Sequence, residues 1–116
     1  MQRILVVEDE FLIAMHIVDI LEDDGYQVVG PVGTLVEAVD IATGGDLDGA
    51  LLDININGGR VDHVADILDR RGVPFMFVSA YSRDHLPKNF IDATLVNKPF
   101  DDRALMQEVR RIGQAA

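Results

Sequence analysis

Hydrophobic residues follow two alternating patterns along this chain. Short, mainly apolar runs occur five times, at 4–7, 27–29, 50–52, 75–78 and 94–96. After four of these runs the apolar residues return every three or four positions, which is the spacing of one helix face, at 13–21, 35–42, 61–68 and 105–112. The runs predict strands, and the spaced stretches predict helices.

The stretch after the fourth run, 82–92, is the weak member of the series. Pro87 interrupts it, and only Leu86, Phe90 and Ile91 offer an apolar face. Proline removes a backbone donor and disfavours a continuous helix. We therefore expect a short or mobile fourth helix here.

A strand followed by a helix, repeated five times, is typical of an α/β fold with a parallel sheet and helices on its faces. Helix starts are also marked, because Thr34 with Glu37 forms a capping-box pattern and Asp101 is a candidate N-cap. A chain of 116 residues fits one domain. We expect residues 1–116 to form that single domain.

Polar residues close four of the five apolar runs. Glu8 and Asp9 follow the first run, Asp53 the third, Ser79 the fourth, and Lys98 lies just after the fifth. If the runs are neighbouring parallel strands, these residues meet at the carboxyl edge of the sheet, where ligands of open α/β sheets bind. The sequence therefore predicts one site with three acids, a hydroxyl and an amine.

These residue types suit phosphoryl transfer onto a carboxylate. Asp53 is the candidate nucleophile toward phosphorus, and an aspartyl phosphate would result. Glu8 and Asp9 supply hard oxygen ligands for Mg²⁺ or Mn²⁺, and a main-chain carbonyl after Asp53, such as that of Asn55, could complete the set. The amine and the hydroxyl, Lys98 and Ser79, fit as partners of the phosphoryl oxygens.

Charge and composition exclude several classes of function. Twenty acidic and ten basic residues give a net charge of -10, which disfavours contact with nucleic-acid phosphates and anionic membranes. There is no cysteine, so disulfides and thiolate metal sites are excluded. The first apolar run is too short for a membrane span or a signal peptide. We expect a cytoplasmic protein that does not bind nucleic acid directly or insert into membranes.

Four segments together resemble the receiver domain of two-component response regulators. They are ILVVEDE at 4–10, ALLDINING at 50–58, FMFVSAY at 75–81 and NKPF at 97–100. The resemblance extends along essentially the whole chain. It implies a flavodoxin-like (βα)5 fold, a doubly wound five-stranded parallel sheet of order 2-1-3-4-5. It also implies a signalling protein, not an enzyme, whose chemistry is its own phosphorylation and autodephosphorylation.

The same resemblance implies a role for each site residue. Asp53 would accept phosphate from a histidine kinase or a phosphotransfer protein of a phosphorelay. The metal ligands would be Glu8, Asp9 and Asp53 with the Asn55 carbonyl, while Ser79 and Lys98 would contact the phosphoryl group. The peptide bond between Lys98 and Pro99 would be cis.

One position departs from the commonest receivers. Their last strand carries Tyr or Phe three residues before the lysine, and here this residue is Leu95. The segment FVSAY at 77–81 instead resembles the FAT GUY subclass, with Ala80 in place of that motif's glycine. In this subclass Ser79, Ala80 and Tyr81 would form the switch, Tyr81 would be its mobile aromatic residue, and kinases of the HWE type would be common partners.

Three other functions compete with a receiver. A haloacid-dehalogenase-type phosphatase also uses an aspartate nucleophile and Mg²⁺, but it needs a second Asp where this chain has Asn55. A flavodoxin-like cofactor binder would need a phosphate loop after the first strand, where Glu8, Asp9 and Glu10 repel an anion. A phosphate-independent pseudo-receiver is disfavoured by the intact acidic cluster with Lys98. We expect a single-domain response regulator that signals by docking on a downstream protein.

Overall fold

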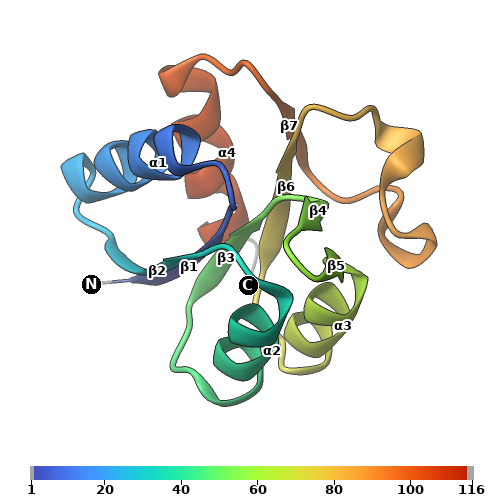
Figure 1. Ribbon diagram of the computed structural model, residues 1–116. Coiled ribbons are helices and arrows are strands. Elements are labelled where there is room, and N and C mark those ends of the chain that lie inside the picture. The colour runs from blue at the N-terminus through green and yellow to red at the C-terminus, as the bar shows by residue number, and fades with distance from the viewer. Residues whose placement is uncertain (1, 115–116) are drawn as a thin grey trace.

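A five-stranded parallel sheet forms the centre of the computed structural model, which describes residues 2–114. The sheet order is β2-β1-β3-β6-β7 (Figure 1). Counted along the chain, this is the predicted order 2-1-3-4-5, so the predicted fold is confirmed. The strands are β1 (Arg3–Val7), β2 (Gln27–Val32), β3 (Gly49–Leu52), β6 (Phe75–Ser79) and β7 (Leu95–Asn97).

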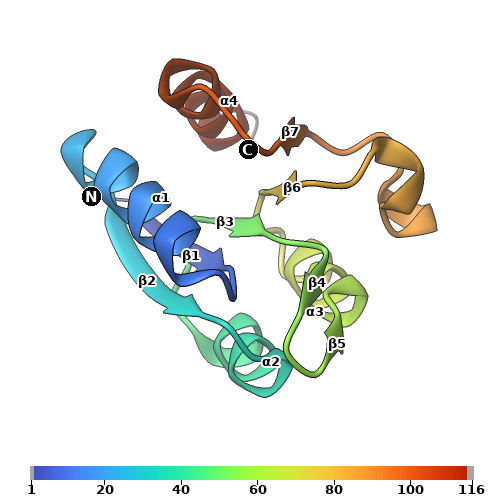
Figure 2. The ribbon, with the colours of Figure 1, turned by 45° about the horizontal axis from the view of Figure 1, so that its top comes forward.

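Helices cover both faces of the sheet (Figure 2). The helices α1 (Phe11–Asp23) and α4 (Asp102–Gln114) pack on one face, and α2 (Leu35–Gly44) and α3 (Asp62–Arg70) pack on the other. Successive residues of a strand point to opposite faces, so Ile4 and Val6 join the α1 and α4 side while Leu5 and Val7 join the other. The three central strands, β1, β3 and β6, are buried on both sides, as expected for a parallel sheet.

The predicted helix starts are present. The Thr34 side chain accepts a hydrogen bond from the Glu37 amide, and its hydroxyl donates to the Glu37 carboxylate at 2.9 Å. The Asp101 carboxylate accepts from the Ala104 amide at 3.3 Å. These contacts satisfy amide groups that the first helical turn leaves without intrahelical partners.

Between β6 and β7 the chain forms no α-helix. Two 3₁₀ turns, η1 (Arg83–His85) and η2 (Lys88–Phe90), lie on either side of Pro87, and the segment projects from the side of the molecule (Figure 1). The expected short fourth helix is thus reduced to these two 3₁₀ turns. Pro87 has an extended ψ of 139°, and Leu86 and Pro87 are the only buried residues in the two turns and their flanks, so a helix would gain little packing.

Arginine side chains hold this segment in place. Arg83 donates to the carbonyls of Ile91 at 2.9 Å and Ala93 at 2.6 Å, and Arg60 donates to the carbonyl of His85 at 2.9 Å. Arg60 belongs to a small hairpin, β4 (Asn55–Ile56) and β5 (Gly59–Arg60), which follows Asp53 directly. The segment after β6 is therefore tied to the loop that follows β3.

Within residues 2–114, no helix is long and apolar enough to cross a membrane.

Candidate functional site

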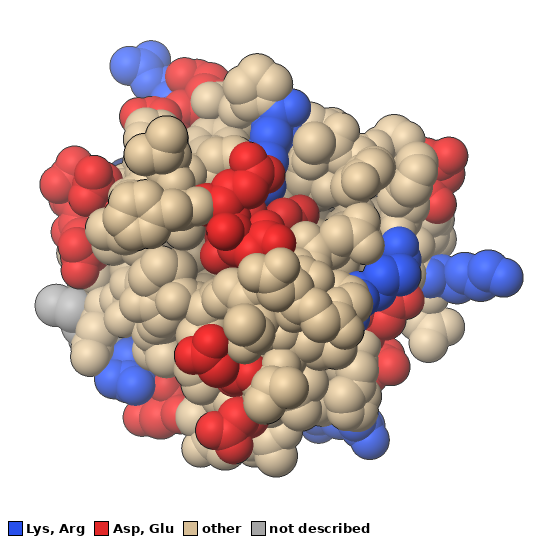
Figure 3. Space-filling view, viewed as in Figure 1, with Lys and Arg blue, Asp and Glu red and all other residues tan. Residues whose placement is uncertain are grey.

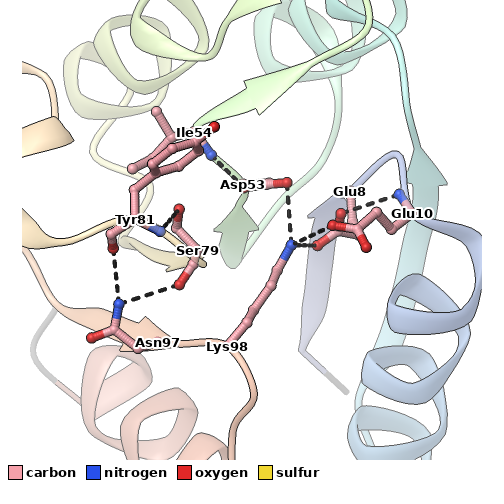
Figure 4. Close-up of polar contacts among 8 residues, drawn as sticks. All are labelled: Glu8, Glu10, Asp53, Ile54, Ser79, Tyr81, Asn97 and Lys98. Atoms are coloured by element: carbon pink, nitrogen blue, oxygen red, sulfur yellow. Dashed lines mark hydrogen bonds and ion pairs between the residues drawn. The ribbon is translucent and has the colours of Figure 1, made fainter.

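The register of the strands brings the predicted site residues to one edge of the sheet. Val7 of β1 pairs with Leu52 of β3, so the next residues, Glu8 and Asp53, leave the sheet side by side. At the same edge, Ser79 pairs with Asn97, and Lys98 follows. Residues that are up to 90 positions apart in sequence thus face one another (Figure 4).

The Lys98 ammonium group lies among three carboxylates. Its Nζ atom is 2.6 Å from Glu8 Oε1, 3.2 Å from Asp53 Oδ2 and 3.5 Å from Glu10 Oε1. The Lys98 side chain is only 8% exposed. Burial by itself would lower the pKa of Lys98, but its bond to Glu8 and the charge of Asp53 outweigh it and raise that pKa. Lys98 is therefore a permanent cation at neutral pH.

Both oxygens of the buried Asp53 carboxylate are engaged. Oδ1 accepts a hydrogen bond from the Ile54 amide at 2.8 Å, and Oδ2 accepts from Lys98. The Asp53 amide in turn donates to the Val7 carbonyl at 2.9 Å. The side chain and backbone of Asp53 are thus fixed relative to β1 and Lys98.

Glu8 is the acid of the site whose pKa is raised by its surroundings. Its side chain is almost completely buried, and this burial, reinforced by the charge of Asp53, raises its pKa to about 7 although Lys98 acts in the opposite direction. One oxygen, Oε2, accepts from the Glu10 amide at 3.2 Å. The other, Oε1, lies within ion-pair distance of Lys98 but has no partner in hydrogen-bond geometry within the described part of the chain. Glu8 Oε1 is thus able to take a further positive ligand.

The carboxylates that cluster here are Glu8, Glu10 and Asp53, with one oxygen of each lying within 4.8 Å of the others. Glu10 was not among the predicted residues. Its backbone is extended, with φ -85° and ψ 109°, and side chains two residues apart in an extended chain point the same way. Two glutamates two positions apart at a strand end, as in E-D-E, are the sequence signal that indicates Glu10.

Asp9 and Asn55 lie outside this cluster. Asp9, between the two glutamates, is exposed, lies against Gly33 and is not part of the carboxylate group. Asn55 is the exposed first residue of β4. The three clustered carboxylates offer the hard oxygen donors that Mg²⁺ prefers, so the donor chemistry fits such a cation.

Ser79, at the end of β6, is buried, and its hydroxyl oxygen accepts a hydrogen bond from the Tyr81 amide at 3.0 Å. Asn97, which the sequence reading did not include, donates to the Tyr81 carbonyl at 2.8 Å and to the Ser79 carbonyl at 3.3 Å. The Tyr81 side chain is 45% exposed, and its ring lies 4.9 Å from that of His85. Tyr81 therefore points away from the carboxylates, toward η1.

Beside the carboxylates lies an open groove of about 470 Å³. Glu10, Ala80 and Lys98 line it together with Leu12, Ile13, His16, Pro99 and Phe100. The peptide bond between Lys98 and Pro99, two of these lining residues, is cis. The groove gives a mainly apolar approach to the polar site.

A family model, that of the response regulator receiver domain, matches residues 4–110. The chain belongs to this family. Receiver domains are signalling domains that are generally not catalytic, and they work with kinases or phosphotransfer proteins. The predicted receiver is thus confirmed at the level of the family.

Two curated regulators are similar to this receiver. The phyllosphere-induced regulator PhyR of Methylorubrum extorquens is 38% identical over 107 residues, which cover 84% of this chain and 38% of PhyR. The transcriptional regulatory protein PdtaR of Mycobacterium tuberculosis is 31% identical over 103 residues, which cover 85% of this chain and 50% of PdtaR. The receiver therefore spans half or less of the length of these relatives.

Solved structures show the same architecture. SdrG from Sphingomonas melonis Fr1 is 35% identical and superposes with a TM-score of 0.84, covering 97% of this chain and 96% of SdrG. The receiver domain of a sensor histidine kinase from Pseudomonas aeruginosa PAO1 superposes with a TM-score of 0.81 at 22% identity, covering 97% of this chain and 98% of that domain. The latter holds a magnesium ion in its active-site cleft.

Proposed function

We propose that this receiver accepts a phosphoryl group on Asp53. The observation that carries this proposal is the ion pair of 3.2 Å between Lys98 Nζ and Asp53 Oδ2 at the carboxyl edge of the sheet. A carboxylate can attack phosphorus only where positive charge offsets the repulsion of two anions. Because Ile54 and Lys98 each hold one oxygen, the Asp53 carboxylate is oriented before a donor arrives.

The reaction forms one bond and breaks one. An Asp53 oxygen forms the new P–O bond, and the P–N bond to the imidazole of the donor histidine breaks, with its electron pair going to the imidazole nitrogen, which takes up a proton. Lys98 and the Ser79 hydroxyl are the proposed partners of the phosphoryl oxygens. The donor is a histidine kinase, with the HWE type as a candidate, or a phosphotransfer protein.

The proposed metal ligands are Glu8, Asp9 and Asp53 with the main-chain carbonyl of Asn55. The clustered oxygens of Glu8 and Asp53 support this set, and Asp9 is next to Glu8 in the chain. The Asp9 carboxylate is exposed and has no hydrogen bond or ion pair within the described residues, so it is available to a cation. Mg²⁺, when bound, supplies charge neutralisation for both the nucleophile and the phosphoryl group.

The test is covalent labelling followed by intact-mass spectrometry. With acetyl phosphate and Mg²⁺ the wild type gains the mass of one phosphoryl group, and with EDTA it gains none. Asp53→Asn stays unlabelled, while the matched change Asp69→Asn, at an exposed position in α3, labels like the wild type. Labelling of Asp53→Asn at the wild-type rate would refute Asp53 as the acceptor.

The signal is proposed to leave the site through Ser79, Ala80 and Tyr81 and the two 3₁₀ turns that follow. Leu95 cannot act as an aromatic switch on the last strand, and the Tyr81 ring lies 4.9 Å from the His85 ring of η1, tilted by 33°. The similarity to PhyR and SdrG supports a related subclass, and we propose the FAT GUY type. The output is docking on a downstream protein, because a net charge of -10 opposes direct binding to nucleic acid.

The alternative functions have less support. A phosphatase of the haloacid-dehalogenase type needs an acid where this chain has the exposed amide of Asn55. A pseudo-receiver would have no use for a buried lysine held between two buried acids. The receiver's own phosphorylation and autodephosphorylation are the only reactions proposed.

A further inference from the structure

Glu10 is the one carboxylate of the cluster that lies at the mouth of the site. Its side chain is 62% exposed, whereas those of Glu8 and Asp53 are 1% and 9% exposed. Its Oε1 atom is 3.5 Å from Lys98 Nζ (Figure 4). Glu10 also lines the groove beside the site, together with Lys98.

The site itself is rich in acids, with Glu8, Asp9, Glu10 and Asp53 close in sequence or in space. Figure 3 shows acidic side chains gathered at the centre of the face toward the viewer, with few basic groups beside them. A phosphodonor that approaches Asp53 is itself an anion, so each acid at the mouth repels it. Buried acids can be neutralised by Lys98 and a cation, and exposed Asp9 is a proposed ligand of that cation, whereas the exposed Glu10 keeps its charge toward an incoming donor.

The single ammonium group of Lys98 has two sets of possible partners. The proposed chemistry needs it at the phosphoryl oxygens, and in the resting structure three carboxylates share it. Glu10 is the weakest of these partners by distance. It is also dispensable for metal binding if Glu8, Asp9 and Asp53 are the ligands.

We propose that Glu10 is a specificity-determining residue, which holds Lys98 at rest and slows phosphorylation by free anionic phosphodonors. This inference rests on the proposed function of Asp53. The effect should scale with donor charge, because Coulomb repulsion is proportional to it. At a distance of roughly 8 Å through water, one unit of donor charge corresponds to about a two-fold change in rate, and two units to about five-fold.

The experiment compares initial labelling rates for two small donors by intact-mass spectrometry, with Mg²⁺ saturating for every variant. Acetyl phosphate is a dianion at neutral pH, and phosphoramidate carries one negative charge less. Glu10→Gln should label about five-fold faster with acetyl phosphate and about two-fold faster with phosphoramidate. Glu10→Asp keeps the charge and should label within two-fold of the wild type.

The matched control is Glu22→Gln, which removes the same charge from an exposed position at the far end of α1. It should leave both rates unchanged. The acceleration in Glu10→Gln should also shrink as salt is added, since screening weakens interactions between exposed charges.

The outcomes separate this inference from the proposed function. Suppose the wild type labels on Asp53. If Glu10→Gln then labels no faster, or labels faster by the same factor with both donors, Glu10 does not discriminate phosphodonors by their charge. Slower labelling of Glu10→Gln at saturating Mg²⁺ would likewise overturn it, because Glu10 would then be needed by the reaction. If no form labels on Asp53, the proposed function itself fails, and this inference fails with it.

Discussion

Replacing Glu8 by Gln should remove a loss of folded-state stability that the wild-type receiver shows as pH rises. Glu8 has an ordinary pKa of 4.5 and a folded-state pKa of about 7, so the folded state binds the proton more tightly than the unfolded state. Stability contributed by this proton is present below pH 4.5 and is lost as pH rises toward 7. Without a divalent cation, wild-type stability should therefore decrease across this window.

The magnitude follows from the size of the pKa change. One unit of pKa is worth about 1.4 kcal/mol, so the loss between pH 5 and pH 8 amounts to roughly 2.5 kcal/mol. Glu8→Gln cannot ionise and keeps the shape of the protonated acid. The free energy of unfolding of Glu8→Gln minus that of the wild type should therefore rise by roughly 2.5 kcal/mol from pH 5 to pH 8.

Urea unfolding in EDTA, monitored by far-ultraviolet circular dichroism, measures this difference, since the chain has no tryptophan for fluorescence. Both proteins are unfolded at several pH values from 5 to 8, and Glu22→Gln serves as the control that removes an exposed acid. Saturating Mg²⁺ should abolish most of the wild-type loss, because it binds the ionised carboxylates. A stability difference between wild type and Glu8→Gln that stays constant from pH 5 to 8 would refute the raised pKa.

Three further outcomes are expected. Millimolar Mg²⁺ should raise the thermal midpoint of the wild type, and Asp9→Asn should reduce that rise; a midpoint insensitive to Mg²⁺ would contradict the cation site. Arg60→Gln should speed amide hydrogen exchange in residues 83–92 while changing global stability by about 1 kcal/mol or less, and unchanged exchange would show that Arg60 does not restrain the turns. Beryllofluoride with Mg²⁺ should shift the amide resonances of Tyr81 and of residues 83–92, and shifts confined to the surroundings of Asp53 would exclude the proposed switch.

The strands and the site could be predicted together because both depend on where apolar runs end. In a parallel sheet every run ends at the same edge, so Glu8, Asp53, Ser79 and Lys98 were placed on one edge without any knowledge of their contacts. The positive charge of Lys98 also predicts that it pairs with the acids at this edge.

The missed features depend on side-chain direction and on contacts between distant segments. Glu10 joins the carboxylate group because the chain stays extended past β1, and the metal-ligand role of Asp9 stays a prediction. The segment after β6 has too few apolar residues for its conformation to be read from spacing. Arg60 and Arg83 hold it through backbone carbonyls, and such contacts leave no periodic pattern in the sequence.

The two edge strands of the sheet have a consequence for how this receiver meets other proteins. The edge strand β7 has only three residues and is soon followed by Pro99, and the opposite edge strand, β2, contains Pro31. Edge strands with free backbone groups invite pairing with other chains, whereas short strands and prolines leave few donors to pair with. Contacts with a partner therefore depend on side chains, and single substitutions can change these contacts for one partner at a time.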